Sequence, residues 1–217
     1  MTNISDSQIR AMRAWAGLTG VIWTGYLVAR LTVGGLCERP SLVENFDREQ
    51  YLGNWYEMYR SYTVLFEEDD CATATYRTLP YNYIEVNNIE YSIDEQRNIG
   101  GIPAPGKAQC SSLRSGLCQV KFNEFQPWSD YSILYTDYTT HTVVYGCDNF
   151  GGGALRFDWL WSLTRTPLEI GSAAHTSMKD TIWAVLADKL PDFDPDTELR
   201  PTIQTTGSGC VYNSPYI

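Results

Sequence analysis

The sequence predicts an all-β fold in which eight antiparallel strands, in up-and-down order, close into a barrel. A C-terminal α-helix is expected to pack outside the barrel, and a transmembrane helix to precede it. Short runs rich in Tyr, Val, Ile, Thr and Trp recur over residues 54–165, separated by Gly, Pro, Asn and Asp, which predicts the strands. Apolar residues at helical spacing follow at 172–190. Of 217 residues, 43% are hydrophobic and 19% charged, so the chain is too apolar to be disordered.

A hydrophobic segment at residues 14–36 predicts a membrane anchor after a short tail, residues 1–13. Arg30 is the only charged residue in this segment, which has about the ~20 residues that a bilayer-spanning helix needs. The alternative is a cleaved signal peptide, because Val33-Gly34-Gly35 supplies the small residues that a signal peptidase accepts.

Residues around this segment predict its orientation and a role for it. Arg10 and Arg13 precede it and favour a cytosolic or matrix N-terminus, with the barrel on the opposite side of the membrane. A stripe of small residues (Ala16, Gly20 and Thr24) would allow close approach of a helix from another transmembrane subunit.

The barrel is expected to occupy about residues 54–165 of a domain that spans 37–212. Tight links such as Tyr138-Thr-Thr-His-Thr142 make neighbouring strands antiparallel, and closure into a barrel removes exposed sheet edges. A barrel of this size can hold one small ligand. The eight strands are expected at 54–62, 71–79, 83–92, 97–109, 117–125, 131–138, 141–148 and 154–165.

The pattern changes to a helical period at 172–190. Met178, Ile182 and Leu186 belong to one apolar stripe, which predicts a helix with a single buried face. Pro191 ends this helix, and an acidic tail follows at 191–217.

Six cysteines are spread along the chain without a Cys-x-x-Cys pair. Zinc sites favour short paired spacings, and the two histidines, His141 and His175, stand alone, so no metal site is expected. An even, dispersed set predicts up to three disulfides in an oxidising compartment. The alternative is six buried thiols in a reducing compartment. Fifteen connectivities are possible, and the spacing alone does not choose among them.

Charge and motifs exclude several functions. Sixteen Lys and Arg against 26 Asp and Glu give a formal net charge of −10, which argues against a nucleic-acid partner. No nucleophile-elbow, zinc-protease, phosphate-loop or dinucleotide motif is present, so neither enzymatic activity nor a cofactor is expected. His141 is interpreted as a turn residue and His175 as a residue on the helix surface.

Three motifs resemble the signatures of the lipocalin family, in the family's order and spacing. Leu52-Gly53-Asn54-Trp55 resembles the first, and Thr136-Asp137-Tyr138 resembles the second. Trp161-Ser162-Leu163-Thr164-Arg165 resembles the third, in which an arginine ends the last barrel strand. The likeness covers about 37–212 and is greatest to the apolipoprotein D and bilin-binding group. It implies a carrier of small hydrophobic molecules rather than an enzyme.

This resemblance also implies disulfides and structural roles. The family pattern implies the pairs Cys37 with Cys147 and Cys71 with Cys210. The remaining two, Cys110 and Cys118, are expected to form a third bridge across a hairpin, which the family does not imply. Arg165 is expected to cover the indole of Trp55 at the closed end. Asp137 is expected to accept backbone hydrogen bonds in a turn.

Aromatic residues are the candidate ligand contacts. Trp159 and Trp161 share strand parity with Arg165, so this face is expected to turn inward. By resemblance, Tyr76 and Trp161 line the pocket. Three further candidates depend on the strand register: Phe122, Tyr135 and Tyr145. The alternative is that aromatic side chains simply fill a narrow barrel.

The acidic run Glu67-Glu68-Asp69-Asp70 follows the first strand and is expected in a loop at the barrel mouth. It is most simply a solvated loop. The functional alternative is a mouth that repels fatty-acid carboxylates and favours neutral or cationic ligands.

Together these features predict a membrane-anchored lipocalin that binds a lipid, sterol, retinoid or pigment, with membrane lipid as a further partner. The alternative is a structural subunit of a larger membrane complex, for instance in the mitochondrial inner membrane. In either case the barrel is expected on the oxidising side, in the mitochondrial intermembrane space or an extracytoplasmic or lumenal space. A cleaved N-terminus would instead give a secreted protein.

Overall fold

The computed structural model describes residues 36–100, 105–150 and 152–212. The expected anchor at 14–36 therefore lies outside the described residues, apart from Leu36. Within the described ranges, no helix combines the length and the apolar character needed to cross a bilayer. The chain divides into two compact units, of which the smaller includes Cys37 and Asn149–Phe157. The larger unit, Glu38–Asp148 with Asp158–Ile217, contains the barrel interior described below.

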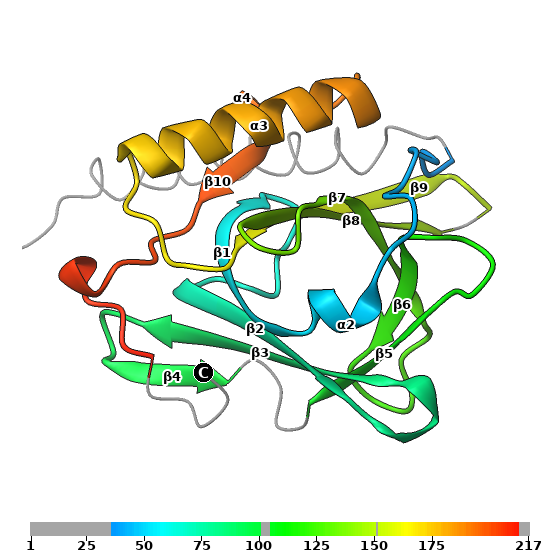
Figure 1. Ribbon diagram of the computed structural model, residues 1–217, viewed down its shortest axis with the longest axis horizontal. Coiled ribbons are helices and arrows are strands. Elements are labelled where there is room, and N and C mark those ends of the chain that lie inside the picture. The colour runs from blue at the N-terminus through cyan, green and yellow to red at the C-terminus, as the bar shows by residue number, and fades with distance from the viewer. Residues whose placement is uncertain (1–35, 101–104, 151, 213–217) are drawn as a thin grey trace, which may run out of the picture. The chain divides into compact units, whose positions relative to one another are not determined.

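Antiparallel strands form a closed barrel (Figure 1). Successive strands pair along the chain, except that β4 and β5 both pair with β3, and β1 also pairs with β9, which closes the sheet. This arrangement is the eight-stranded barrel that the sequence predicts, with β4 and β5 as two pieces of one expected strand. The strands are β1 (Gly53–Ser61), β2 (Asp70–Thr78), β3 (Ile84–Ser92), β4 (Arg97–Gly100), β5 (Gly106–Cys110), β6 (Leu117–Lys121), β7 (Ser129–Thr136), β8 (His141–Phe150) and β9 (Leu155–Thr164).

Two strand boundaries differ from the prediction. The strand expected at 97–109 is divided, and its two pieces pair with different parts of β3. The strand expected at 117–125 ends at Lys121, because the Asn123 side chain accepts hydrogen bonds from the backbone N–H groups of Phe125 and Gln126 and turns the chain. Such local turns outweigh the β-propensity of the surrounding residues.

Helix α3 (Ala173–Lys189) packs outside the barrel, where Figure 1 shows it above β7 and β10. Ser172 caps its N-terminus by accepting a hydrogen bond from the His175 N–H at 3.2 Å. The buried stripe includes Met178, Ile182 and Leu186, as expected. The prediction that His175 lies on the helix surface is wrong. His175 is buried, and its Nε2 lies 2.9 Å from the Tyr59 hydroxyl, because its position belongs to the same stripe.

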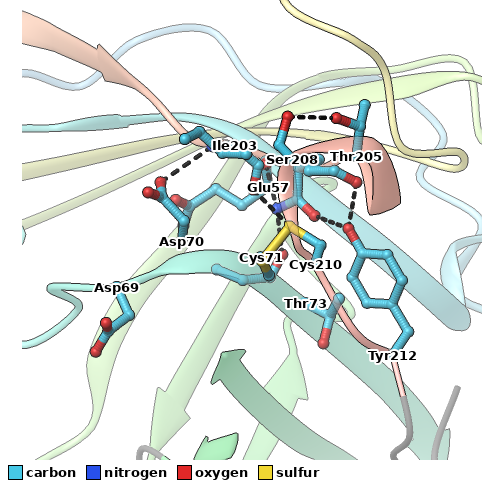
Figure 2. Close-up of a disulfide and its surroundings, with 12 residues drawn as sticks. Glu57, Asp69, Asp70, Cys71, Thr73, Ile203, Thr205, Ser208, Cys210 and Tyr212 are labelled. Carbon is cyan, nitrogen blue, oxygen red and sulfur yellow. Dashed lines mark hydrogen bonds between the residues drawn. A yellow bond between two sulfur atoms is a disulfide. The ribbon is translucent and has the colours of Figure 1, made fainter. Parts of the chain in front are cut away.

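The C-terminal segment after α3 pairs with the barrel sheet. Strand β10 (Leu199–Pro201) pairs with β1, and the short helices α4 (Pro195–Glu198) and η2 (Thr206–Ser208) lie before and after β10. A further short helix, η1 (Pro80–Asn82), connects β2 to β3. The Cys71–Cys210 disulfide then ties the tail to β2, as Figure 2 shows. Beside it, the Cys71 N–H donates to the Ile203 carbonyl at 2.8 Å, and Asp70 accepts from the Ile203 N–H at 3.0 Å.

The other cysteines are also oxidised. Cys110 and Cys118 lie opposite each other in the β5–β6 ladder and are bonded, which is the bridge expected across this hairpin. Cys37 and Cys147 are both disulfide-bonded as well, so no described cysteine is a free thiol. Disulfides persist in oxidising environments, which indicates that the barrel occupies such a compartment.

The closed end of the barrel is built around Trp55, which is fully buried. The Arg165 guanidinium lies 3.8 Å from the centre of the Trp55 ring. Arg165 also donates to the carbonyls of Tyr138 at 2.8 Å and Asn54 at 3.0 Å. Helix α2 (Arg48–Tyr51) covers this end, and its last residue packs on Trp55 at 5.1 Å between ring centroids. The signature residues therefore form the floor of the barrel.

Asp137 fixes the adjacent turn. Its Oδ1 accepts from the N–H groups of Thr139, Thr140 and His141 at 2.7 to 3.1 Å. Burial acts to raise the pKa of Asp137, but these hydrogen bonds outweigh it and the pKa is lowered. The neighbouring residues of the motif take part as well, since the Tyr138 N–H donates to the Thr136 hydroxyl.

Candidate ligand-binding site

A cavity of about 520 Å³ occupies the barrel interior above this floor. Its volume falls within the range of small-molecule pockets. Inward residues of the strands form its walls, because successive side chains of a strand point to opposite faces of the sheet. The aromatic residues that line it are Phe66, Tyr76, Phe122, Tyr131, Trp159 and Trp161.

Four of the six predicted ligand contacts line this cavity. Tyr76 comes from β2, Trp159 and Trp161 come from β9, and Phe122 follows β6. Their aromatic side chains therefore surround an open volume rather than fill the barrel completely. Whether they contact a ligand stays a prediction.

The other two candidates, Tyr135 and Tyr145, are not among the residues that line the cavity. A bulge in β7 lies between Ile133 and Tyr135, so Tyr135 no longer shares the inward face of Ile133. It stacks instead on His141, at 5.2 Å between ring centroids.

Tyr145 belongs to the outward face of β8. It pairs with Ser132, whereas its neighbour Val144 pairs with the inward Ile133. The Tyr145 hydroxyl donates to Asp158 at 2.8 Å. The prediction that Tyr145 faces the cavity is therefore wrong. The strand register differs from the expected one by one residue, and such a difference moves a side chain to the opposite face of the sheet.

A chain of tyrosine hydroxyls connects the floor to the cavity. The hydroxyl oxygens of Tyr51 and Tyr131 lie 3.0 Å apart, and those of Tyr131 and Tyr76 lie 2.8 Å apart. Burial raises the pKa of Tyr51 to about 12, and it raises the pKa values of Tyr76 and Tyr131 well above the usual range. These phenols therefore stay neutral and serve as hydrogen-bonding groups.

Charged side chains gather on another part of the wall. The buried guanidinium of Arg60 donates to Glu57 at 2.7 Å and lies 3.3 Å from Glu90. Glu67 comes from the β1–β2 loop and accepts a hydrogen bond from the Trp161 indole N–H at 2.9 Å. Three of these residues line the cavity: Glu57, Glu67 and Glu90. We call these three residues, together with Arg60, the acidic cluster.

The electrostatics of the acidic cluster favour protonated carboxyl groups. Burial raises the pKa of Glu67 to about 8, and the negative charges of Glu57 and Glu90 add to this effect. Burial likewise raises the pKa of Glu90 to about 7, although Arg60 opposes the shift. The cluster holds more acidic groups than its guanidinium can neutralise.

Strand parity contains a sequence signal for the inward position of two of these residues. Glu57 lies two positions after the inward Trp55, and Glu90 continues the inward series of Ile84 and Val86 along β3. Glu67 has no such signal, because it lies in a loop whose path depends on tertiary contacts.

Comparison with known proteins identifies the family of this chain. The model of the lipocalin-like domain matches residues 46–184, which include the barrel and most of α3. The chain belongs to the lipocalin family. Mouse apolipoprotein D is 35% identical over 134 residues, which are 61% of this chain and 68% of that protein. The Lazarillo protein of Schistocerca americana is 27% identical over 64% of this chain and 63% of its own length.

Solved structures of other proteins share the fold of this lipocalin. Insecticyanin of Manduca sexta superposes with a TM-score of 0.62 at 16% identity, over 81% of this chain and 90% of insecticyanin. Lobster apocrustacyanin A1 gives a TM-score of 0.61 at 16% identity, over 81% and 92% of the two chains. At this level of identity the likeness concerns the fold alone.

Proposed function

We propose that this lipocalin is a non-catalytic binding protein that holds a small hydrophobic molecule inside its barrel. The observation that carries the proposal is the cavity of about 520 Å³, whose wall is largely aromatic and aliphatic. Apolar surface buried there contributes about 25 cal/mol per Å² removed from water, enough for a lipid-sized ligand to bind tightly. Family membership supports the same class of ligand, which includes lipids, sterols, retinoids and pigments.

Tryptophan fluorescence tests this proposal directly. Trp159 and Trp161 line the cavity, so a ligand whose absorption overlaps tryptophan emission, such as retinol, is expected to quench their emission saturably at one molecule per chain. Trp161→Phe should remove much of the quenching. Trp183→Phe is the matched control, because Trp183 lies on α3 and packs against Tyr59 outside the cavity. Absence of saturable quenching across a panel of retinol, sterols, fatty alcohols and bilins would contradict the proposal.

The membrane anchor stays a proposal supported by the sequence alone. The apolar segment 14–36 motivates it, together with the oxidising compartment that the disulfides indicate. Resistance of the full chain to extraction by alkaline carbonate would support an anchor, and release into the supernatant would contradict it. The second possibility, a subunit of a membrane complex, predicts co-migration with a larger assembly in native electrophoresis after mild solubilisation.

A further inference from the structure

We propose that the acidic cluster forms a subsite for the cationic head of an amphiphile, an ammonium group carried on an apolar tail. This inference rests on the proposed function and narrows its ligand class. It is carried by the position of three carboxyl groups within the wall of an otherwise apolar cavity.

When its carboxyl groups are ionised, the acidic cluster carries more negative charge than Arg60 can balance. Arg60 is fully buried and meets both Glu57 and Glu90, so one guanidinium serves two carboxylates. Thr202 also donates to Glu57 at 2.5 Å, which satisfies that carboxylate further. Glu67 adds a third carboxyl group, stabilised by the Trp161 indole.

Glu90 is the group that points to a ligand. Glu90 is 6% exposed, and its carboxyl group interacts with the Asp69 backbone N–H and forms an ion pair with Arg60 at 3.3 Å. Among the described residues, its Oε1 nevertheless accepts no hydrogen bond. A buried polar atom without a hydrogen bond costs free energy, which a ligand donor facing the cavity would recover. An ammonium group supplies three N–H donors and the missing positive charge.

The surroundings of the acidic cluster suit an ammonium and disfavour a carboxylate. The Phe66 and Trp161 rings lie 6.4 Å apart beside Glu67, and aromatic faces attract cations. A fatty-acid head placed here would face three acidic groups. The tail of the amphiphile would occupy the aromatic remainder of the cavity, where its methylene groups are removed from water.

Other charged groups around the acidic cluster do not neutralise it. Asp69 accepts from Arg60 through its backbone carbonyl at 2.6 Å, and its carboxylate adds to the negative potential at Glu90. Arg200 is directed toward Asp70, at 3.3 Å. Elsewhere in the cavity lining, Asp130 of β7 is a further acidic group, and it accepts a hydrogen bond from Gln119 at 3.1 Å. Burial raises the pKa values of Glu67 and Glu90, and the neighbouring carboxylates add to the shift.

The test compares three ligands of equal chain length by isothermal titration: dodecylamine, 1-dodecanol and sodium dodecanoate, each below its aggregation concentration. At pH 8.5 the amine is expected to bind about 10- to 100-fold more tightly than the alcohol, the range of one charge-assisted hydrogen bond. The carboxylate should bind most weakly. Since Glu67 and Glu90 become protonated on acidification, the preference for the amine should shrink toward pH 6, while alcohol binding stays constant.

Single substitutions test whether the acidic cluster causes the preference for the amine over the alcohol. Glu67→Gln and Glu90→Gln should each reduce the ratio of amine affinity to alcohol affinity. Glu68→Gln is the matched control, because Glu68 is an exposed neighbour in the same loop. If Glu90→Gln does not fold, Glu67→Gln and the pH series carry the test.

The outcomes separate the two proposals. Binding of the alcohol without a preference for the amine, or a preference that Glu67→Gln leaves unchanged, would overturn the subsite and leave the hydrophobic carrier intact. Failure of all three ligands and of the retinol panel would overturn the carrier itself, and the subsite with it.

Discussion

Replacing Arg165 with alanine is expected to lower the free energy of unfolding by about 3–4 kcal/mol and to leave ligand affinity unchanged. The guanidinium lies 3.8 Å from the Trp55 ring centre, a cation–π contact that contributes about 1–2 kcal/mol when desolvated. Its hydrogen bonds to the Tyr138 and Asn54 carbonyls contribute about 1 kcal/mol each. The third strong acceptor, the Gln50 carbonyl, is exposed, so water replaces the lost donor there.

Urea unfolding monitored by far-ultraviolet circular dichroism measures this change as a shift of the midpoint at constant slope. Arg97→Ala is the control, because Arg97 is exposed and pairs only with Glu95 among the described residues, so its loss should change stability by less than about 0.5 kcal/mol. Ligand affinity should hold because Arg165 is not among the residues lining the cavity. A loss below about 1 kcal/mol, or a folded variant whose affinity drops tenfold, would refute the reasoning.

Three further predictions concern backbone, disulfides and pH. Gly53→Ala should destabilise the barrel by about 1–2 kcal/mol in urea unfolding, because Gly53 has φ +98° and an added Cβ would lie 3.3 Å from the Arg165 guanidinium; an unchanged midpoint would contradict this. Replacing both cysteines of the Cys71–Cys210 bond with serine should lower the melting temperature more than the same change at Cys110–Cys118, because the bonds span 139 and 8 residues; the reverse order would argue against chain entropy as the cause. The pKa of Glu67, raised from 4.5 to about 8, means that its contribution to stability is complete below pH 4.5 and is lost as the pH rises through 8, by at most about 1.4 kcal/mol per pH unit. Thermal unfolding of Glu67→Gln should therefore depend less on pH over this interval than that of the parent, and equal slopes would show that Glu67 does not hold the proton.

Strand positions and the barrel floor could be predicted from the sequence for identifiable reasons. Alternating β-branched and aromatic residues between turn residues indicate strands, and β1 and β9 begin and end within one residue of the expected bounds. The apolar stripe of Met178, Ile182 and Leu186 likewise predicts the position and the buried face of α3. Trp55 and Arg165 are 110 positions apart, so their contact was expected from the lipocalin resemblance rather than from any local pattern.

The remaining features depend on irregularities that have no clear sequence signal. The bulge between Ile133 and Tyr135 changes which side chains face inward, and alternation alone cannot locate it. Glu67 reaches the cavity from a loop, where an acidic run is ordinarily solvated. The tail, held by Cys71–Cys210 and by β10, is specified by long-range pairing.

Filling the cavity tests the central claim most directly. Ala74 lines the cavity opposite Trp55 in the β1–β2 ladder, so Ala74→Phe places a ring in the volume where the ligand is expected. Native mass spectrometry after incubation with retinol and dodecylamine, with circular dichroism to verify folding, then reports occupancy. The account predicts one bound molecule per chain for the parent protein and a strong loss of occupancy for the folded Ala74→Phe variant. Equal occupancy of the two proteins would show that the ligand binds elsewhere and would contradict a carrier function for the barrel interior.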